Sequence, residues 1–77
     1  MKIKIYGADW CSDCVAAKDF LKSKGIKFNY IDITENQDAI NILENINAGK
    51  RIIPTIDFDG KIYVNPGISK LSKIIKQ

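Results

Sequence analysis

The sequence predicts an α/β domain in which three helices flank a four-stranded mixed sheet, in the order β-α-β-α-β-β-α. Two kinds of apolar spacing support this prediction: strict alternation in some segments and helical spacing in the segments between them. A third observation is Asp59-Gly60 between two apolar runs, which is a strong signal for a two-residue hairpin. A chain of 77 residues forms one domain, so we expect a single unit over residues 1–77.

The first half of the chain predicts a strand–helix–strand unit. Lys2–Tyr6 alternates and is rich in β-branched residues, as is typical of a strand, and Lys27–Ile33 alternates again. The helix between them is predicted over Ser12–Lys24, and Gly25 marks its end. Its apolar residues at helical spacing are Cys14, Ala17, Phe20 and Leu21. Such a unit is expected to be a right-handed parallel crossover.

A second helix is predicted to begin at a capping box over Thr34–Gln37, in which the Thr34 hydroxyl accepts from the Gln37 amide. The helix is expected to end near Asn47-Ala48-Gly49, because glycine adopts the left-handed conformation readily. Its predicted inward face consists of Ala39, Ile42, Leu43 and Ile46.

The last part of the chain predicts the hairpin and a third helix. The hairpin strands are expected over Ile53–Phe58 and Lys61–Val64, on either side of Asp59-Gly60. A turn at Asn65-Pro66-Gly67 leads into a helix from about Ile68 to Ile75. Its predicted inward residues are Ile68, Leu71 and Ile75.

Composition excludes several classes of function. The net charge is +3, and the basic residues are spread along the chain without interleaved aromatics, so we expect no nucleic-acid partner. No apolar run approaches the roughly 20 residues that span a bilayer, and the N-terminus lacks the apolar stretch of a signal peptide. We therefore expect a cytoplasmic protein that does not bind a membrane.

Cys11 and Cys14, the only cysteines, admit three interpretations: a redox pair, half of a metal site, or two small apolar residues. Their place after a predicted strand and at the start of a helix favours a redox pair. A zinc site needs four ligands, and the chain has no histidine, so a metal or iron–sulfur site would require a dimer held through Cys11. A disulfide that closes so short a loop stabilises little.

The predicted helix start assigns different roles to the two thiols. Unpaired amides at a helix N-terminus carry positive partial charge, which stabilises a thiolate at Cys11. Cys14 lies one turn further on, on the same face, and is expected to be less exposed. Cys11 would therefore attack a substrate disulfide, and Cys14 would displace the substrate and leave an intramolecular disulfide. The Asp13 carboxylate opposes ionisation and predicts a less oxidising pair than one with a neutral dipeptide between its cysteines.

The chain resembles the glutaredoxins of the thioredoxin superfamily. The residues that carry this resemblance are Trp10-Cys11-Ser12-Asp13-Cys14, Ile53-Pro54-Thr55 and Asp59-Gly60. Asn47–Thr55, with Asn65-Pro66, looks most like mycoredoxins and related short glutaredoxin-like proteins.

The resemblance implies a monomeric thiol–disulfide oxidoreductase. It would reduce protein disulfides, or mixed disulfides with a low-molecular-weight thiol, and would hold no cofactor tightly. Glutathione or another small thiol would be its co-substrate. A thioredoxin-type reductase or ribonucleotide reductase is an expected partner.

The resemblance also implies site residues. Ile53–Pro54 is expected to be a cis peptide, with Pro54 against the cysteines and the Ile53 backbone paired with substrate. The predicted substrate contacts are Trp10, Arg51, Ile53, Pro54, Gly67, Ile68 and Ser69. Residues 64–69 contain none of the carboxylates that glutathione-using relatives carry there, so another small thiol or a protein disulfide is an equal expectation. Asp9 is expected to cap the first helix.

Overall fold

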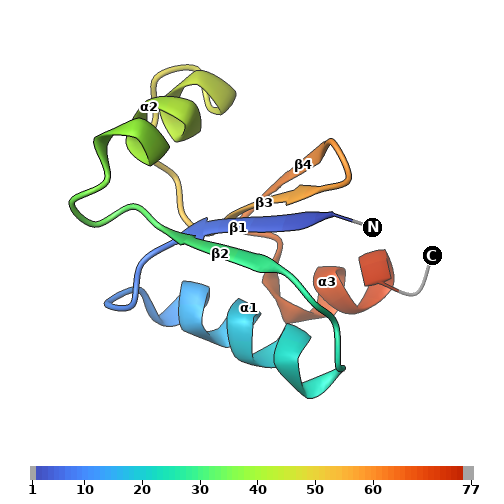
Figure 1. Ribbon diagram of the computed structural model, residues 1–77. Helices are drawn as coiled ribbons and strands as arrows, with labels where there is room; N and C mark the ends of the chain where they lie inside the picture. Colours follow the sequence, from blue (N-terminus) through green and yellow to red (C-terminus); the bar gives the residue numbers. More distant parts are fainter. Residues whose placement is uncertain (1, 76–77) are drawn as a thin grey trace.

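The computed structural model describes residues 2–75 (Figure 1). Seven elements follow one another along the described chain: β1 (Ile3–Gly7), α1 (Ser12–Ser23), β2 (Asn29–Asp32), α2 (Gln37–Ile46), β3 (Thr55–Phe58), β4 (Lys61–Val64) and α3 (Gly67–Ile75). This is the predicted order β-α-β-α-β-β-α, so the predicted fold class is confirmed.

The strands form one mixed sheet in the order β2-β1-β3-β4. β1 and β2 are parallel, as a strand–helix–strand crossover requires, while β1–β3 and β3–β4 are antiparallel. Ile5 lies at the centre of the sheet, where it pairs with Tyr30 of β2 and Ile56 of β3. The crossover places the start of α1 directly after the carboxyl end of a central strand.

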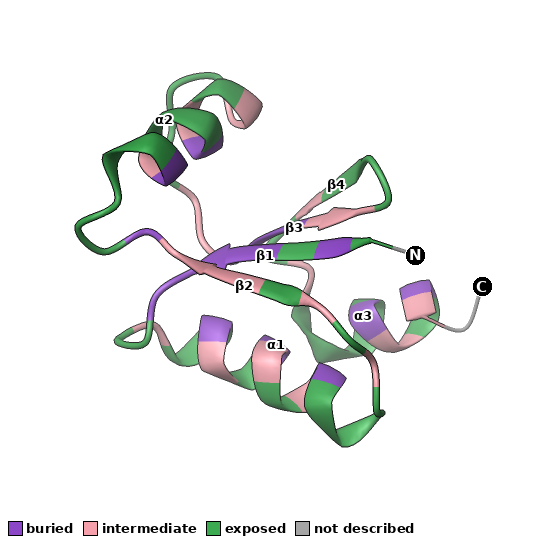
Figure 2. Cartoon of the chain, viewed as in Figure 1, coloured by how far each residue is buried: buried purple, intermediate pink, exposed green. Residues whose placement is uncertain are grey.

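Helices cover the two faces of the sheet unequally. α1 and α3 lie side by side on one face, and α2 lies on the other (Figure 1). Figure 2 shows that the buried residues of α1 and α3 are on the sides that face the sheet. The larger apolar cluster lies there and consists of Ile3, Ile5, Ala17, Leu21, Ile56, Leu71 and Ile74. A smaller cluster under α2 consists of Tyr6, Ile33, Ala39 and Leu43.

The predicted capping box is wrong. Asn36, not Thr34, is the N-cap of α2, and its Oδ1 accepts a hydrogen bond from the Ala39 amide at 3.1 Å. A turn precedes the helix, in which the Asn36 amide donates to the Ile33 carbonyl at 3.2 Å, so the helix starts later than the capping box requires. Thr34 is thereby left outside the helix, with its hydroxyl free to contact the loop before α1.

Two residues predicted to face inward do not. Ile42 is 49% exposed and Ile68 is 42% exposed. α2 contacts the sheet along a narrow stripe through Ala39 and Leu43, so Ile42 lies to one side of the contact. In α3 the buried positions are Leu71 and Ile74, which leaves the first turn of that helix open to solvent.

Candidate active site

Cys11 is the N-cap residue of α1. Its backbone is extended, with φ −99° and ψ 113°, and its carbonyl accepts from the Val15 amide at 3.0 Å. Its Sγ accepts a hydrogen bond from the Cys14 amide at 3.3 Å. The sulfur therefore accepts from one of the backbone amides that have no partner within the helix at its start.

The prediction that Asp9 caps α1 is wrong, because Cys11 occupies that position. Asp9 instead forms an ion pair with Lys18, with 3.6 Å between Oδ1 and Nζ. An aspartate shortly before a helix is a common capping signal, but here the cysteine sulfur replaces the carboxylate.

Cys14 is completely buried, whereas Cys11 is half-buried, and both are free thiols. Burial raises the pKa of the Cys14 thiol to about 12, and its hydrogen bond with Cys11 and the charges of Cys11 and Asp13 act in the same direction. A hydrogen bond from the backbone of Ala8 opposes them. The two sulfurs thus differ in access and in electrostatic surroundings, with the accessible one at the helix start.

Gly7 provides the space that Cys14 occupies. A Cβ added at Gly7 would lie 2.9 Å from Cys14 Sγ and 3.0 Å from Cys14 Cβ, closer than real Cβ atoms approach. The end of β1 and the first turn of α1 are therefore in contact through the bare backbone of a glycine. The sequence gives no sign of this role for Gly7, since nothing local distinguishes it from other glycines.

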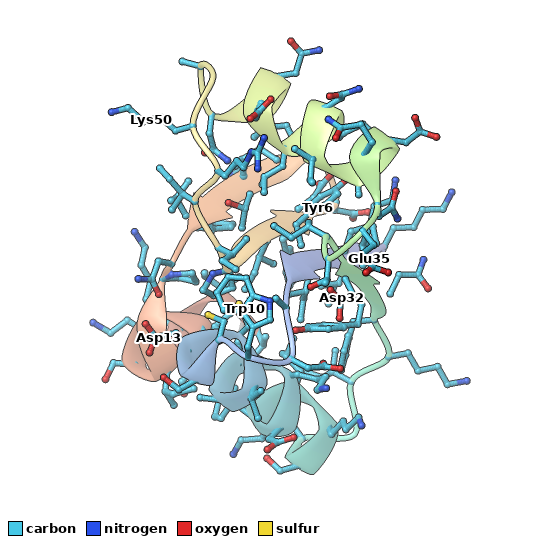
Figure 3. All side chains as sticks on the ribbon, turned by 90° about the vertical axis from the view of Figure 1, so that its left-hand side faces the viewer. Tyr6, Trp10, Asp13, Asp32, Glu35 and Lys50 are labelled. Carbon is cyan, nitrogen blue, oxygen red and sulfur yellow. The ribbon has the colours of Figure 1, made fainter. Side chains whose placement is uncertain are left out.

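Trp10 lies on the surface next to the cysteines. Its side chain is 73% exposed, and its Nε1 donates to Thr34 Oγ1 at 3.2 Å. Figure 3 shows Trp10 and Asp13 beside the two sulfur atoms. The indole thus donates one hydrogen bond to the β2–α2 loop, and its side chain is largely exposed to solvent.

The peptide bond between Ile53 and Pro54 is cis, as the resemblance implies. Pro54 is buried, and its carbonyl accepts from the Asn65 amide at 2.7 Å, which ties it to the turn before α3. The next residue, Thr55, is also buried, and its Oγ1 donates to the Ile52 carbonyl at 2.6 Å.

Asn47 holds this segment to α2. Its Nδ2 donates to Thr55 Oγ1 and to the Leu43 carbonyl, both at 3.2 Å. The polar contacts on Thr55 therefore fix the backbone on either side of Pro54. The sequence predicts only that the second helix ends near Asn47. The hydrogen bond from Asn47 to Thr55, eight residues later on β3, could not be predicted because no sequence spacing indicates it.

A pocket of about 130 Å³ lies beside α1 at the start of α3. Its lining residues are Asp13, Ala16, Ala17, Pro54, Asn65, Pro66, Gly67 and Ile68. Three of the predicted substrate contacts, Pro54, Gly67 and Ile68, thus lie together around one hollow. The exposed apolar side chain of Ile68, wrongly expected in the core, belongs to this pocket.

The other predicted contacts lie around the pocket or away from it. Ser69 is exposed in the first turn of α3 but does not line the pocket. Arg51 Nε donates to Glu44 Oε2 of α2 at 2.7 Å, so its charge is already paired. The Ile53 side chain is half-buried and packs against the cluster under α2.

A larger hollow of about 890 Å³ lies elsewhere, along β2 and the C-terminal half of α1, and neither cysteine lines it. Five lysines border it: Lys2, Lys4, Lys18, Lys22 and Lys27. Among residues 2–75, no three side chains of histidine, cysteine, aspartate or glutamate come together as a metal site. No helix in the same range has the length and apolarity needed to cross a bilayer.

Comparisons with known proteins agree with this geometry. The family model described as Glutaredoxin matches residues 3–63. Mycoredoxin 1 of Corynebacterium glutamicum is 33% identical over 66 residues, which cover 83% of this chain and 80% of that protein. The crystal structure of the thioredoxin-like protein BC3987 superposes with a TM-score of 0.81 at 28% identity and covers 94% of this chain and 97% of that one. The NrdH-redoxin of Escherichia coli has the same fold, with a TM-score of 0.76 at 22% identity and coverage of 100% and 96%.

Proposed function

The chain belongs to the glutaredoxin family of thiol–disulfide oxidoreductases, and we propose that it works by a dithiol route through Cys11 and Cys14. Its substrates in this proposal are protein disulfides, or mixed disulfides between a protein and a low-molecular-weight thiol. The observation that carries the proposal is the position of Cys11 at the N-cap of α1, with its sulfur on the Cys14 amide and Cys14 buried behind it.

In the first step the Cys11 thiolate attacks one sulfur of a substrate disulfide. The new bond joins Cys11 to that sulfur, the substrate disulfide breaks, and the other substrate sulfur leaves with the electron pair and takes a proton from water. In the second step Cys14 attacks Cys11 Sγ, which breaks the mixed disulfide and releases the remaining thiol. The substrate has gained two electrons, and the Cys11/Cys14 dithiol has lost them in becoming a disulfide.

The substrate in this proposal lies across the Ile53–Pro54 backbone and the 130 Å³ pocket. The Ile53 backbone would pair with an extended peptide as an added strand does. The exposed Trp10 and Ile68 would contact apolar groups on either side of the reacting sulfur. A carboxylate of a small thiol would be bound by the backbone amides at the start of α3 near Ser69.

The reductant in this proposal is a small thiol other than glutathione, or a thioredoxin-type reductase. Residues 64–69 have no carboxylate to pair with the ammonium group of glutathione. Arg51 would be available to a substrate carboxylate only by leaving Glu44. We further propose a cytoplasmic protein with ribonucleotide reductase among its candidate partners, since a dithiol that acts as a reductant has to be kept reduced by its compartment.

Turnover assays on single variants test the dithiol route. Cys11→Ser should abolish disulfide reduction, whereas Cys14→Ser should still attack and should accumulate a mixed disulfide visible by mass spectrometry. Ser12→Ala changes a neighbouring side chain of the same motif without removing a thiol and should keep its turnover. Full turnover by Cys11→Ser would contradict the proposal.

A second assay identifies the reductant. The oxidised protein is supplied in parallel with glutathione, with cysteine as a small thiol, and with a thioredoxin reductase and NADPH. We expect recycling by glutathione to be the slowest of the three. If glutathione recycles the disulfide fastest, the argument from the missing carboxylates is wrong.

A further inference from the structure

Tyr30 has a buried hydroxyl group that the dithiol route leaves unexplained. The residue lies on β2, and its ring packs against the cluster under α1. Among the described residues, its Oη is the one buried side-chain nitrogen or oxygen without a hydrogen-bond partner. A buried donor without a partner has lost the hydrogen bond that it would make with water, and this loss destabilises the folded state. Such groups are therefore uncommon in native proteins.

The Cys14 thiol lies close to this hydroxyl group. A Cβ at Gly7 would lie 2.9 Å from Tyr30 Oη and 2.9 Å from Cys14 Sγ, so the two atoms are at most twice that distance apart. Residue 7 is a glycine, so it adds no side chain between them. The unpartnered donor and the buried sulfur therefore both lie next to the position that a side chain of residue 7 would occupy.

The charged groups around the phenol are known from the structure. Lys18 Nζ lies 4.5 Å from the centre of the Tyr30 ring and is paired with Asp9. Burial raises the pKa of Tyr30 to about 12, and the charges of Cys14, Asp9, Asp32 and Cys11 act in the same direction. The phenol therefore keeps its proton at neutral pH and is available as a donor, and the nearby ammonium group polarises it further.

We propose that Tyr30 donates a hydrogen bond to the Cys14 thiolate as this sulfur attacks the mixed disulfide, and thereby accelerates the second step. This inference rests on the proposed dithiol route. The Cys14 S–H gives up its proton, its sulfur forms a bond with Cys11 Sγ, and the bond between Cys11 and the substrate sulfur breaks. The departing sulfur takes the electron pair and picks up a proton through water. Tyr30 keeps its own proton throughout.

Cys14 already accepts a hydrogen bond from the backbone of Ala8, and Tyr30 would supply a second donor at this moment of the reaction. In the free dithiol, the hydrogen bond with Cys11 and the Cys11 charge contribute to the raised pKa of Cys14. Both contributions end when Cys11 enters the mixed disulfide, but burial and the charge of Asp13 remain, and the Ala8 backbone hydrogen bond acts against them. A further neutral donor beside the sulfur offsets burial without adding a charge.

Tyr30→Phe tests this role, with Tyr63→Phe as the matched control. Tyr63 is also half-buried, packs against the same cluster and has a lysine, Lys70, 5.9 Å from its ring centre, but it lies on β4, which β3 separates from the strand of Gly7. Each reduced variant is mixed with a chromogenic aryl disulfide in a stopped-flow experiment. The first equivalent of aryl thiol reports attack by Cys11, and the second reports displacement by Cys14.

We expect Tyr30→Phe to slow the second release about tenfold or more, the size expected for a hydrogen bond to a charged group, and to leave the first release within about twofold. Tyr63→Phe should change neither phase. An unchanged second release in Tyr30→Phe overturns the inference and leaves the dithiol route intact. If Cys11→Ser still released both equivalents, the dithiol route itself would fail.

Two further readouts separate this role from a structural one. Removal of an unpartnered hydroxyl should leave the melting temperature of Tyr30→Phe equal to or above that of the parent protein. In a Cys11→Ser background, Cys14 is the only thiol, so thiolate absorbance measured against pH reports its ionisation alone. Addition of Tyr30→Phe should move the midpoint of this ionisation to higher pH. A lower melting temperature with both release phases slowed equally, or an unmoved midpoint, would overturn the inference.

Discussion

Replacement of Gly7 by alanine tests the close contact between β1 and α1. Gly7 has ordinary strand backbone, so alanine adds no conformational strain there. Its methyl group would lie within 3.0 Å of Cys14 Sγ, Cys14 Cβ and Tyr30 Oη, and α1 must move to relieve the overlap. Overpacking of a core costs about 1–3 kcal/mol, which for a domain of this size lowers the melting temperature by about 4–24 °C.

Calorimetry on the reduced protein measures this loss, and a double-mutant cycle assigns it to the contact. Cys14→Ala together with Tyr30→Phe removes two of the three close atoms, so Gly7→Ala should lose much less stability in that background. Gly25→Ala is the control, because no atom lies within 4 Å of its added Cβ and its φ of +70° penalises alanine equally in both backgrounds. An equal cost of Gly7→Ala in both backgrounds would refute the steric argument.

Four further predictions concern other parts of the fold. Asn47→Ala should lower the free energy of unfolding by about 1–3 kcal/mol in chemical denaturation, because the buried threonine after Pro54 loses a donor; an unchanged midpoint would contradict this. Asp13→Asn should make the dithiol more oxidising in a redox titration, since the carboxylate disfavours thiolate; an unmoved potential would count against it. Leu43→Ala should cost about 2–5 kcal/mol, whereas Ile42→Ala should cost under about 0.5 kcal/mol because its side chain is half exposed. A hydrogen bond from the Thr34 amide lowers the pKa of Asp32 on folding. The resulting stabilisation is present above about pH 4 and is lost as the pH falls through the lower folded value, so the stability difference from Asp32→Asn should shrink in acid.

The order of elements could be predicted because each element has a local signal. Alternation marked the strands, and Asp59-Gly60 marked the hairpin that the structure contains. The errors came from tertiary contacts that local patterns do not encode. Ile42 and Ile68 follow helical spacing, but their burial depends on how much of each helix lies over the sheet. The start of α2 moved because a turn at Asn36 replaced the predicted capping box.

The reactive part of the site could be predicted, and its support could not. The spacing of Cys11 and Cys14 and their place after a strand are local, and the cis bond before Pro54 followed from a family resemblance. Gly7 lies on β1 and Tyr30 on β2, and these two strands are far apart in the sequence. Both residues lie close to Cys14 only because the two strands pair in the folded sheet. The sequence therefore identifies the two candidate reactive thiols, but it does not identify the residues that surround them in the fold.

The complete burial of Cys14 makes the two thiols separable by simple protein chemistry. An alkylating reagent added to the native reduced chain should modify Cys11 and leave Cys14 untouched until the chain opens, because a sulfur with no accessible surface cannot meet the reagent. Once Cys11 is blocked, the slow appearance of a second adduct measures how often that opening occurs. The alkylation rate of Cys14 thus reports how often the chain opens around this residue, without any introduced label.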